Sequence, residues 1–125
     1  MKILVTGGAG FIGSSFVRFL STKKITIHVI DNLTYASNFN SIKYLVDNGK
    51  IEFSEIDICD KKRLKDVFLH FKPEKIVHFA AESHVDQSIK NPGKFIFTNI
   101  IGTYNLLDIS LEYYNSLNKN DKVNF

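Results

Sequence analysis

The chain has 125 residues, 44% of them hydrophobic, which suits one globular domain that buries about two thirds of the surface its unfolded form exposes. Its formal net charge is +3, but Lys and Arg alternate with Asp and Glu and form no continuous stripe, so we expect no nucleic-acid partner. One cysteine, Cys59, leaves no disulfide framework and no metal-ligand spacing, and no apolar run approaches ~20 residues. We therefore expect a cytoplasmic chain with no metal, no membrane segment and no signal peptide.

The most informative segment spans residues 3–13, where an apolar strand leads into a glycine-rich turn and an amphipathic helix. The glycines of this turn are Gly7, Gly10 and Gly13. They permit a tight turn, a close approach of the backbone to a pyrophosphate, and close packing of helix on strand, while the first N–H groups of the helix face the phosphates. The alternative is an ordinary strand-to-helix turn. A Walker-type loop is excluded because no Lys follows the last glycine.

A second apolar run, residues 25–30, ends at Asp31, which stands 18 positions after Gly13. This spacing is typical of a carboxylate that accepts hydrogen bonds from the ribose hydroxyls of adenosine. The following residues, 32–34, include no Arg that could meet a 2′-phosphate, so the sequence favours NAD over NADP. A solvated strand end is the alternative interpretation of Asp31.

The hydrophobic periodicity then alternates between helix and strand. We expect a helix over 40–48, a strand over 51–58, a helix capped by Asp60 and ending at Phe71, and a strand over 75–81. A long helix over 92–118 carries apolar residues on more than one face. One face covers the sheet, and the surplus suggests a homodimer.

Repeated strand–helix units with right-handed crossovers predict an α/β fold, a doubly wound parallel sheet in the order 3-2-1-4. Residues 118–121 look like a loop and residues 122–125 look like the start of a fifth strand. We therefore expect residues 1–125 to form an incomplete dinucleotide-binding domain, truncated at the fifth strand, with the substrate domain absent from this chain.

Two further segments lie at predicted strand ends, where ligands bind in such sheets. Asp57 could accept from the adenine amino group and Ile58 could pack on the ring, although an ordinary strand terminus explains the pair equally well. The fourth strand leads into residues 79–88, where small alanines let a cofactor pass and polar side chains offer hydrogen bonds. Surface loops are also polar without any such role.

Five segments resemble the extended short-chain dehydrogenase/reductase superfamily and, within it, the dTDP-glucose 4,6-dehydratase family. They are residues 7–13, 31–36, 57–58, 80–89 and 98–103. The glycine turn and the 57–58 pair are general features of the superfamily. Residues 33–36 and 80–86 are narrower, and sugar-nucleotide epimerases usually differ there.

The resemblance implies a Rossmann-type domain with NAD as cofactor and dTDP-glucose as substrate. Carried over by position, it implies cofactor contacts from Gly7, Gly10, Phe11, Ile12, Gly13, Asp31, Asn32, Leu33, Thr34, Asp57, Ile58, Phe79, Ala80, Ala81, Glu82, Ser83 and Thr98. It also implies that Ser83 and His84 contact the nucleotide sugar.

The reaction implied by the resemblance is the NAD-dependent dehydration of dTDP-glucose to dTDP-4-keto-6-deoxyglucose, a lyase reaction of deoxysugar biosynthesis. The family takes its acid/base groups from a Tyr-x-x-x-Lys pair and a Thr-Asp-Glu segment after the fifth strand, and neither occurs here. We therefore expect the catalytic residues downstream of Phe125 and no turnover by this chain alone. The alternatives are a 4-epimerase or decarboxylase of the same superfamily, or a noncatalytic dinucleotide-binding fragment.

Overall fold

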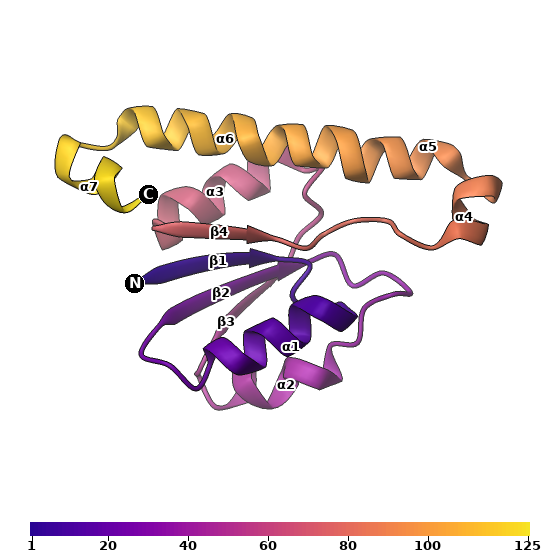
Figure 1. The fold of residues 1–125 in the computed structure, drawn as a ribbon, viewed down its shortest axis with the longest axis horizontal. Helices are drawn as coiled ribbons and strands as arrows, with labels where there is room; N and C mark the ends of the chain where they lie inside the picture. The colour runs from indigo at the N-terminus through magenta and orange to yellow at the C-terminus, as the bar shows by residue number, and fades with distance from the viewer.

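Four parallel strands form the centre of the molecule, with their carboxyl ends at one edge (Figure 1). In the computed structural model, which describes residues 1–125, the strands are β1 (Lys2–Thr6), β2 (Thr26–Asp31), β3 (Glu52–Glu55) and β4 (Lys75–His78). Their order is β3-β2-β1-β4, so the predicted order is confirmed. β3 and β4 are the two edge strands.

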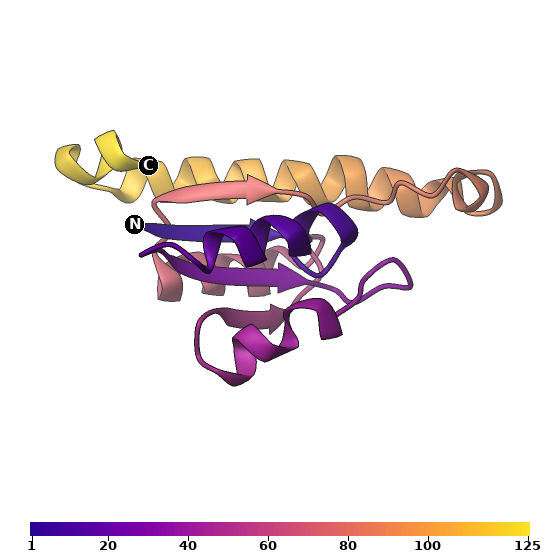
Figure 2. The same ribbon diagram turned by 60° about the horizontal axis from the view of Figure 1, so that its bottom comes forward.

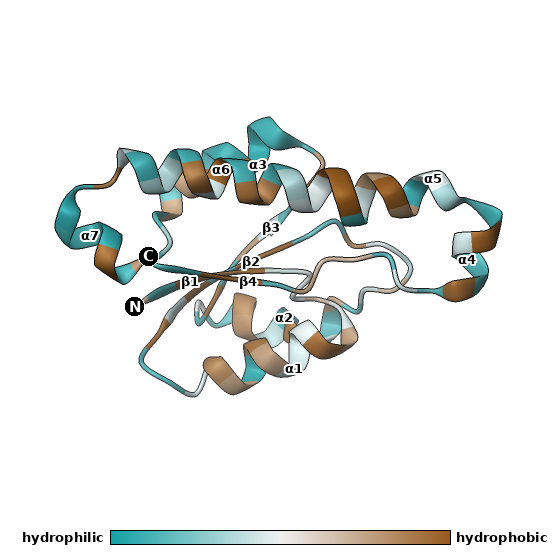
Figure 3. Cartoon of the chain, turned by 45° about the horizontal axis from the view of Figure 1, so that its top comes forward, coloured by the Kyte–Doolittle hydropathy of each residue, from teal (hydrophilic) through white to brown (hydrophobic).

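Helices cover both faces of this sheet. The helices on one face are α1 (Phe11–Leu20) and α2 (Asn40–Asp47), and those on the other are α3 (Lys61–Phe71) and α6 (Thr103–Ser116) (Figures 2 and 3). Between β4 and α6 the chain forms α4 (Val85–Lys90), α5 (Pro92–Phe95) and a π-helical segment, η1 (Ile96–Gly102), and it ends in α7 (Lys119–Asn124). None of these helices combines the length and the apolar character needed to cross a bilayer.

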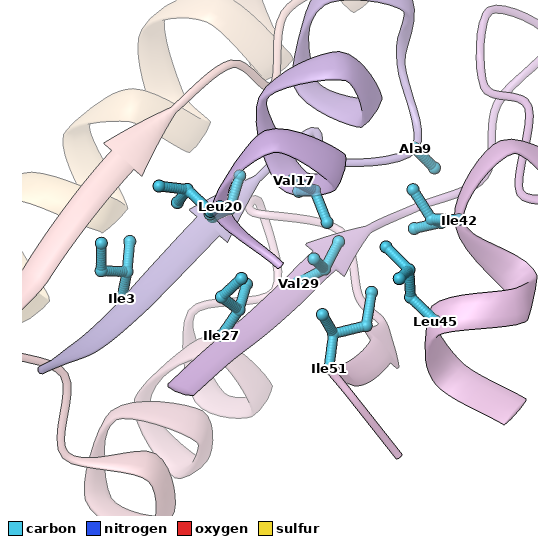
Figure 4. Packing of buried hydrophobic residues seen from close by; sticks show 10 residues of the cluster. Ile3, Ala9, Val17, Leu20, Ile27, Val29, Ile42, Leu45 and Ile51 are labelled. Atoms are coloured by element: carbon cyan, nitrogen blue, oxygen red, sulfur yellow. The ribbon is translucent and has the colours of Figure 1, made fainter. Parts of the chain in front are cut away.

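Two hydrophobic cores follow from the alternation of side chains along the strands. Ile3 and Val5 of β1 pack toward α1 and α2 in a cluster that also contains Val17 and Leu45 (Figure 4). Leu4, the residue between them, packs on the opposite face in a second cluster with α3 and α6. Strands buried on both faces are the reason for the nearly continuous apolar runs in the sequence.

Helix α3 forms as predicted. The Asp60 carboxylate accepts a hydrogen bond from the Arg63 N–H at 3.1 Å, which caps its first turn. Leu64, Phe68 and Phe71 are buried along one stripe of this helix. The α3 stripe therefore holds the second core together.

The third and fourth strands are shorter than predicted. β3 ends at Glu55 and β4 ends at His78, whereas we expected strands to 58 and 81. Their neighbours β2 and β1 leave the sheet after Asp31 and Thr6, so only one further backbone bond extends each ladder. Asp57 and Ile58 consequently lie in a turn and do not close the strand.

The expectation of a fifth strand over 122–125 is wrong, because these residues belong to α7 and its end. The Asn118 side chain accepts from the Asp121 N–H at 3.0 Å and starts a helical turn, and such local bonds compete with sheet formation. Phe125 packs edge-on against Tyr113, with ring centroids 5.2 Å apart. The predicted helix over 92–118 ends at Ser116 and contains the π-helical segment, while α4 was not predicted.

Candidate functional site

A pocket opens beyond the carboxyl ends of β1, β2 and β4, the place where parallel α/β sheets bind ligands. It encloses about 520 Å³, part of which is open to solvent. Its walls are the glycine turn after β1, the end of β2 with the loop that follows it, the turn after β3, the segment after β4, and one residue of η1. Five separate parts of the chain therefore meet there.

The glycine turn approaches its neighbours too closely for any side chain. Gly7 has a φ of +67°, and a Cβ there would lie 2.5 Å from the backbone N of Ala80. A Cβ at Gly13 would lie 2.1 Å from the carbonyl oxygen of Gly7. Both distances are far below van der Waals contact, so this turn requires glycine and leaves its backbone bare toward the pocket.

Helix α1 begins at this turn. Its N-cap residue, Gly10, has no side chain to satisfy the first N–H groups, and no acidic residue occupies the first turn. Phe11 and Ile12 are exposed, Phe11 by 91%, and they stand beside the pocket without lining it. The positive end of the helix dipole is therefore free to meet an anion.

Asp31 is the last residue of β2 and is only 5% exposed. One carboxylate oxygen accepts from the Ala9 N–H at 3.0 Å, and the other accepts from the Leu33 N–H at 2.9 Å and the Ser37 hydroxyl at 2.7 Å. Asp31 therefore ties the glycine turn to the loop after β2. Because a carboxylate offers about four acceptor positions, about one remains for a ligand hydroxyl.

The turn after β3 forms another side of the site. Asn32 donates to the Asp57 carboxylate at 3.3 Å, and this carboxylate also accepts from the Cys59 N–H at 2.8 Å. Ile58 lines the pocket and packs so closely on Gly102 that a Cβ there would lie 2.6 Å from Ile58 Cδ1. Burial, and after it the Asp57 carboxylate, raises the pKa of the Cys59 thiol to about 11, so this thiol is protonated and unreactive at neutral pH.

The segment after β4 forms the remaining wall. The carboxylate of Glu82 is buried and has two partners, Lys94 Nζ at 2.8 Å and the Tyr35 hydroxyl at 3.2 Å. The side-chain amide of Asn99 accepts from the Glu82 N–H at 2.8 Å and donates to the Glu82 carbonyl oxygen at 2.9 Å. Residues of three different elements thus hold Glu82 in place.

A buried polar network supports this wall from below. The Ala80 N–H donates to the Thr6 hydroxyl at 3.3 Å, and this hydroxyl in turn lies 2.5 Å from Nδ1 of His78. The other ring nitrogen of His78 lies 3.0 Å from the Thr103 hydroxyl on α6. Burial lowers the pKa of His78, so its ring is neutral and the network carries no charge.

Most of the predicted cofactor residues meet in this one pocket. Those that line it are Gly7, Gly10, Asp31, Asn32, Thr34, Ile58, Phe79, Ala80, Ala81, Glu82 and Thr98. Those that lie beside it are Phe11, Ile12, Gly13, Leu33, Asp57 and Ser83, and the predicted substrate residue His84 lies outside it as well.

Four lining residues were not predicted: Ile30, Ala36, Ser37 and Ile56. Ile30 and Ile56 lie next to predicted residues, so strand-end position could have identified them. Ser37 reaches the site because its hydroxyl bonds to Asp31, a contact that leaves no pattern in the sequence. His28 lies away from this pocket, against α3, and His70 is a residue of α3.

Solved structures of nucleotide-sugar enzymes share this fold. The chain superimposes on a dTDP-glucose 4,6-dehydratase from Streptomyces venezuelae, solved with NAD bound, with a TM-score of 0.82 and 40% identity over 90% of this chain and 36% of that one. It superimposes on a UDP-Glc/GlcNAc 4-epimerase from Campylobacter jejuni with the same TM-score and 37% identity, over 90% of this chain and 34% of that one.

Curated relatives give the same result. The chain is 45% identical to a dTDP-glucose 4,6-dehydratase of Salmonella typhimurium over 126 aligned positions, 100% of this chain and 35% of that protein. It is 48% identical to one of Neisseria meningitidis serogroup B over 118 positions, 93% of this chain and 33% of that protein. The chain therefore spans about a third of the length of the curated relatives it matches.

The resemblance that the motifs suggested is confirmed by these relatives and by a family model. The family model for GDP-mannose 4,6 dehydratase matches residues 4–125, which is nearly the whole chain. The chain belongs to the GDP-mannose 4,6 dehydratase family.

Proposed function

We propose that this chain binds NAD and is the cofactor-binding part of an NAD-dependent dTDP-glucose 4,6-dehydratase. The observation that carries the proposal is the hydrogen bond of 3.0 Å between the Ala9 N–H and the Asp31 carboxylate, which joins the glycine turn and the β2 carboxylate in one pocket. A dinucleotide needs both groups, one at its pyrophosphate and one at its adenosine ribose.

The residues present fit NAD. The bare backbone at Gly7 and the first turn of α1 suit a pyrophosphate, and the remaining acceptor position of Asp31 suits a ribose hydroxyl. No residue from 31 to 37 is basic, so nothing in this loop would pair with the 2′-phosphate of NADP. The related dehydratase from Streptomyces venezuelae was solved with NAD.

Bound NAD would supply the hydride acceptor and donor for an internal redox reaction on the sugar. The residues of this chain would bind and orient the cofactor, and Ser83 and His84, which follow the β4 wall, would contact the nucleotide sugar. The proton-transfer groups of the reaction would come from elsewhere, because the chain has no Tyr-x-x-x-Lys pair. We also propose that the protein works in the cytosol, since the one cysteine of this chain is free.

Calorimetric titration of the purified chain with NAD and with NADP tests the cofactor assignment. We expect saturable heat with NAD and at least about tenfold weaker binding of NADP, because a 2′-phosphate would face the Asp31 carboxylate. Asp31→Asn should weaken NAD binding, and Asp47→Asn, which changes an exposed carboxylate on α2, should not. A folded chain that binds neither dinucleotide, or both equally, would contradict the proposal.

A 4-epimerase is the second candidate, because the Campylobacter jejuni epimerase matches this fold as well as the Streptomyces venezuelae dehydratase does. The dehydratase is favoured by residues 33–36 and 80–86 and by the curated dehydratases. The residues encoded after Phe125 in the source gene decide between them: a Thr-Asp-Glu segment supports the dehydratase.

We further propose a homodimer of the full-length protein through η1 and α6. Leu106 and Ile109 of α6 are buried against the sheet, which accounts for one apolar face. A second apolar face, on η1 and α6, is exposed. Figure 3 colours hydrophobic residues brown, and much of the ribbon between the labels α5 and α6 is brown. Its members are Ile96, Phe97, Ile100, Ile101, Tyr104, Leu107 and Leu111. An apolar face of this size is typical of a protein–protein contact.

A further inference from the structure

The carboxylate of Glu82 joins two walls of the pocket. Tyr35 stands between Thr34 and Ala36, which both line the pocket on the side of the loop after β2. Its hydroxyl donates to Oε2 of Glu82, on the opposite wall, at 3.2 Å. Figure 1 shows these two segments extending together past the carboxyl ends of the strands. The bond therefore links the loop after β2 to the segment after β4.

Lys94, a residue of α5, contacts both Glu82 and Tyr35. Its ammonium lies 2.8 Å from Oε1 of Glu82 and 5.5 Å from the centre of the Tyr35 ring. The hydrogen bond to Glu82, the largest of several effects, raises the pKa of Lys94, so this side chain stays charged at neutral pH. Lys94 thus holds both the carboxylate and the aromatic ring.

Glu82 itself is fixed. Asn99 bonds to both backbone groups of Glu82, and Asn99 lies in the π-helical segment η1 next to Thr98, which lines the pocket. π-Helical turns are rare and occur frequently at functional sites. The loop of residues 33–39 is itself held near its ends, where Leu33 and Ser37 bond to Asp31. Tyr35 ties the part of the loop between these two residues to the β4 side.

The charge of Glu82 is a second reason for its contact with Lys94. A carboxylate that is 5% exposed is costly unless it is paired. Without Lys94 it would also present an unpaired negative charge in a pocket that takes a pyrophosphate. Lys94 removes this repulsion.

We infer that Tyr35 and Lys94, acting through Glu82, are positioning residues that form a strap across the mouth of the pocket and hold the loop 33–39 closed over the dinucleotide. The inference rests on the proposed function. The strap predicts slow exchange of the loop amides and slow release of the cofactor. Breaking it should speed both without changing the residues that touch the ligand.

Hydrogen–deuterium exchange of residues 33–39, together with the NAD dissociation rate, tests the strap. Tyr35→Phe keeps the ring and removes the hydroxyl, and Lys94→Met keeps the stem and removes the charge. In each we expect loop exchange and NAD release to be about tenfold faster, as the loss of one hydrogen bond to a buried carboxylate allows. Lys94→Arg, which restores the charge, should return both rates toward those of the parent chain.

The matched controls are Tyr44→Phe, an exposed tyrosine on α2, and Lys65→Met, which breaks the exposed ion pair with Glu112. Neither should change the exchange of the loop. Unchanged loop exchange in Tyr35→Phe and Lys94→Met would overturn the strap. So would equal effects of Lys94→Met and Lys94→Arg, since the charge would then have no role. Absence of NAD binding by the parent chain would instead contradict the proposed function, while the exchange rates still test the strap.

Discussion

Two glycines with the same backbone conformation have different surroundings. Gly7 and Gly49 have φ values of +67° and +64°, but a Cβ at Gly7 would collide with the backbone of Phe79 and Ala80, whereas nothing lies within 4 Å of a Cβ at Gly49. A side chain at Gly49 would therefore cause backbone strain alone, whereas one at Gly7 would cause strain and a steric collision.

We predict that Gly49→Ala costs about 1 kcal/mol of unfolding free energy, the usual penalty of a left-handed conformation. Gly7→Ala should cost about 2 kcal/mol more, because the collision with the backbone of Phe79 and Ala80 adds to the strain, and it should abolish NAD binding. Urea denaturation and calorimetry measure the two effects. Equal losses of stability in both variants would mean that the close approach of the turn to Phe79 and Ala80 does not affect stability.

One histidine, His28 of β2, is buried against α3. His28 is 5% exposed, its Nε2 lies 2.9 Å from the Ser54 hydroxyl, and its ring meets the edge of Phe71. Nδ1 lies 3.2 Å from the Glu52 carboxylate without an aligned hydrogen bond. Burial, the largest effect, lowers the pKa of His28 although Glu52 raises it.

The unfolded chain therefore binds a proton on His28 more readily than the folded chain does. Stability should be complete above the unfolded pKa of about 6.5 and should fall as the pH drops through that value toward the lower folded pKa. His78, whose pKa burial also lowers, adds to this trend. Urea midpoints at several pH values measure it, and His28→Gln should flatten the dependence. An equally steep loss of stability in His28→Gln would assign the effect to other groups.

At the scale of elements, the strands and helices with a buried stripe were predictable and the ends of the edge strands were not. Leu64, Phe68 and Phe71 mark α3 by their spacing, because burial imposes a period of 3.6 residues. β3 and β4 end where their neighbours leave the sheet, and the sequence of an edge strand carries no record of its neighbour's turn. The same is true of residues 122–125, whose apolar pattern also fits the short helix α7.

The exposed apolar face of η1 and α6 makes a prediction about association. Leu107→Glu places a charge in the middle of this face and should shift the chain toward the monomer, because a buried unpaired charge is costly. Leu69→Glu, at an exposed leucine on α3 outside the face, is the control. Size-exclusion chromatography with light scattering measures the mass. If Leu107→Glu and the parent chain associate to the same extent, another surface makes the contact.

The whole molecule joins the pocket beyond the strand ends to a sheet whose edge strands are β3 and β4. It spans about a third of the length of its curated relatives. We predict that the purified 125-residue chain, given NAD and dTDP-glucose, forms no 4-keto-6-deoxy sugar, because it carries no acid/base pair for the elimination. Chromatography of the nucleotide sugars after incubation tests this. Product formed by the chain alone would refute the assignment of catalysis to residues outside it.

The sequence by itself determined the parallel sheet and its order, the glycine turn, the acid at the end of β2 and the family. These features depend on local patterns, because a tight turn, a helix stripe and a strand end each need particular residues within a short span. Only the tertiary structure decided that Ser37 and Ala9 engage Asp31, that Glu82 is tied to Tyr35 and Lys94, and that the last residues form a helix. Such contacts join side chains from different elements, and their partners are set by how the elements pack and not by spacing along the chain.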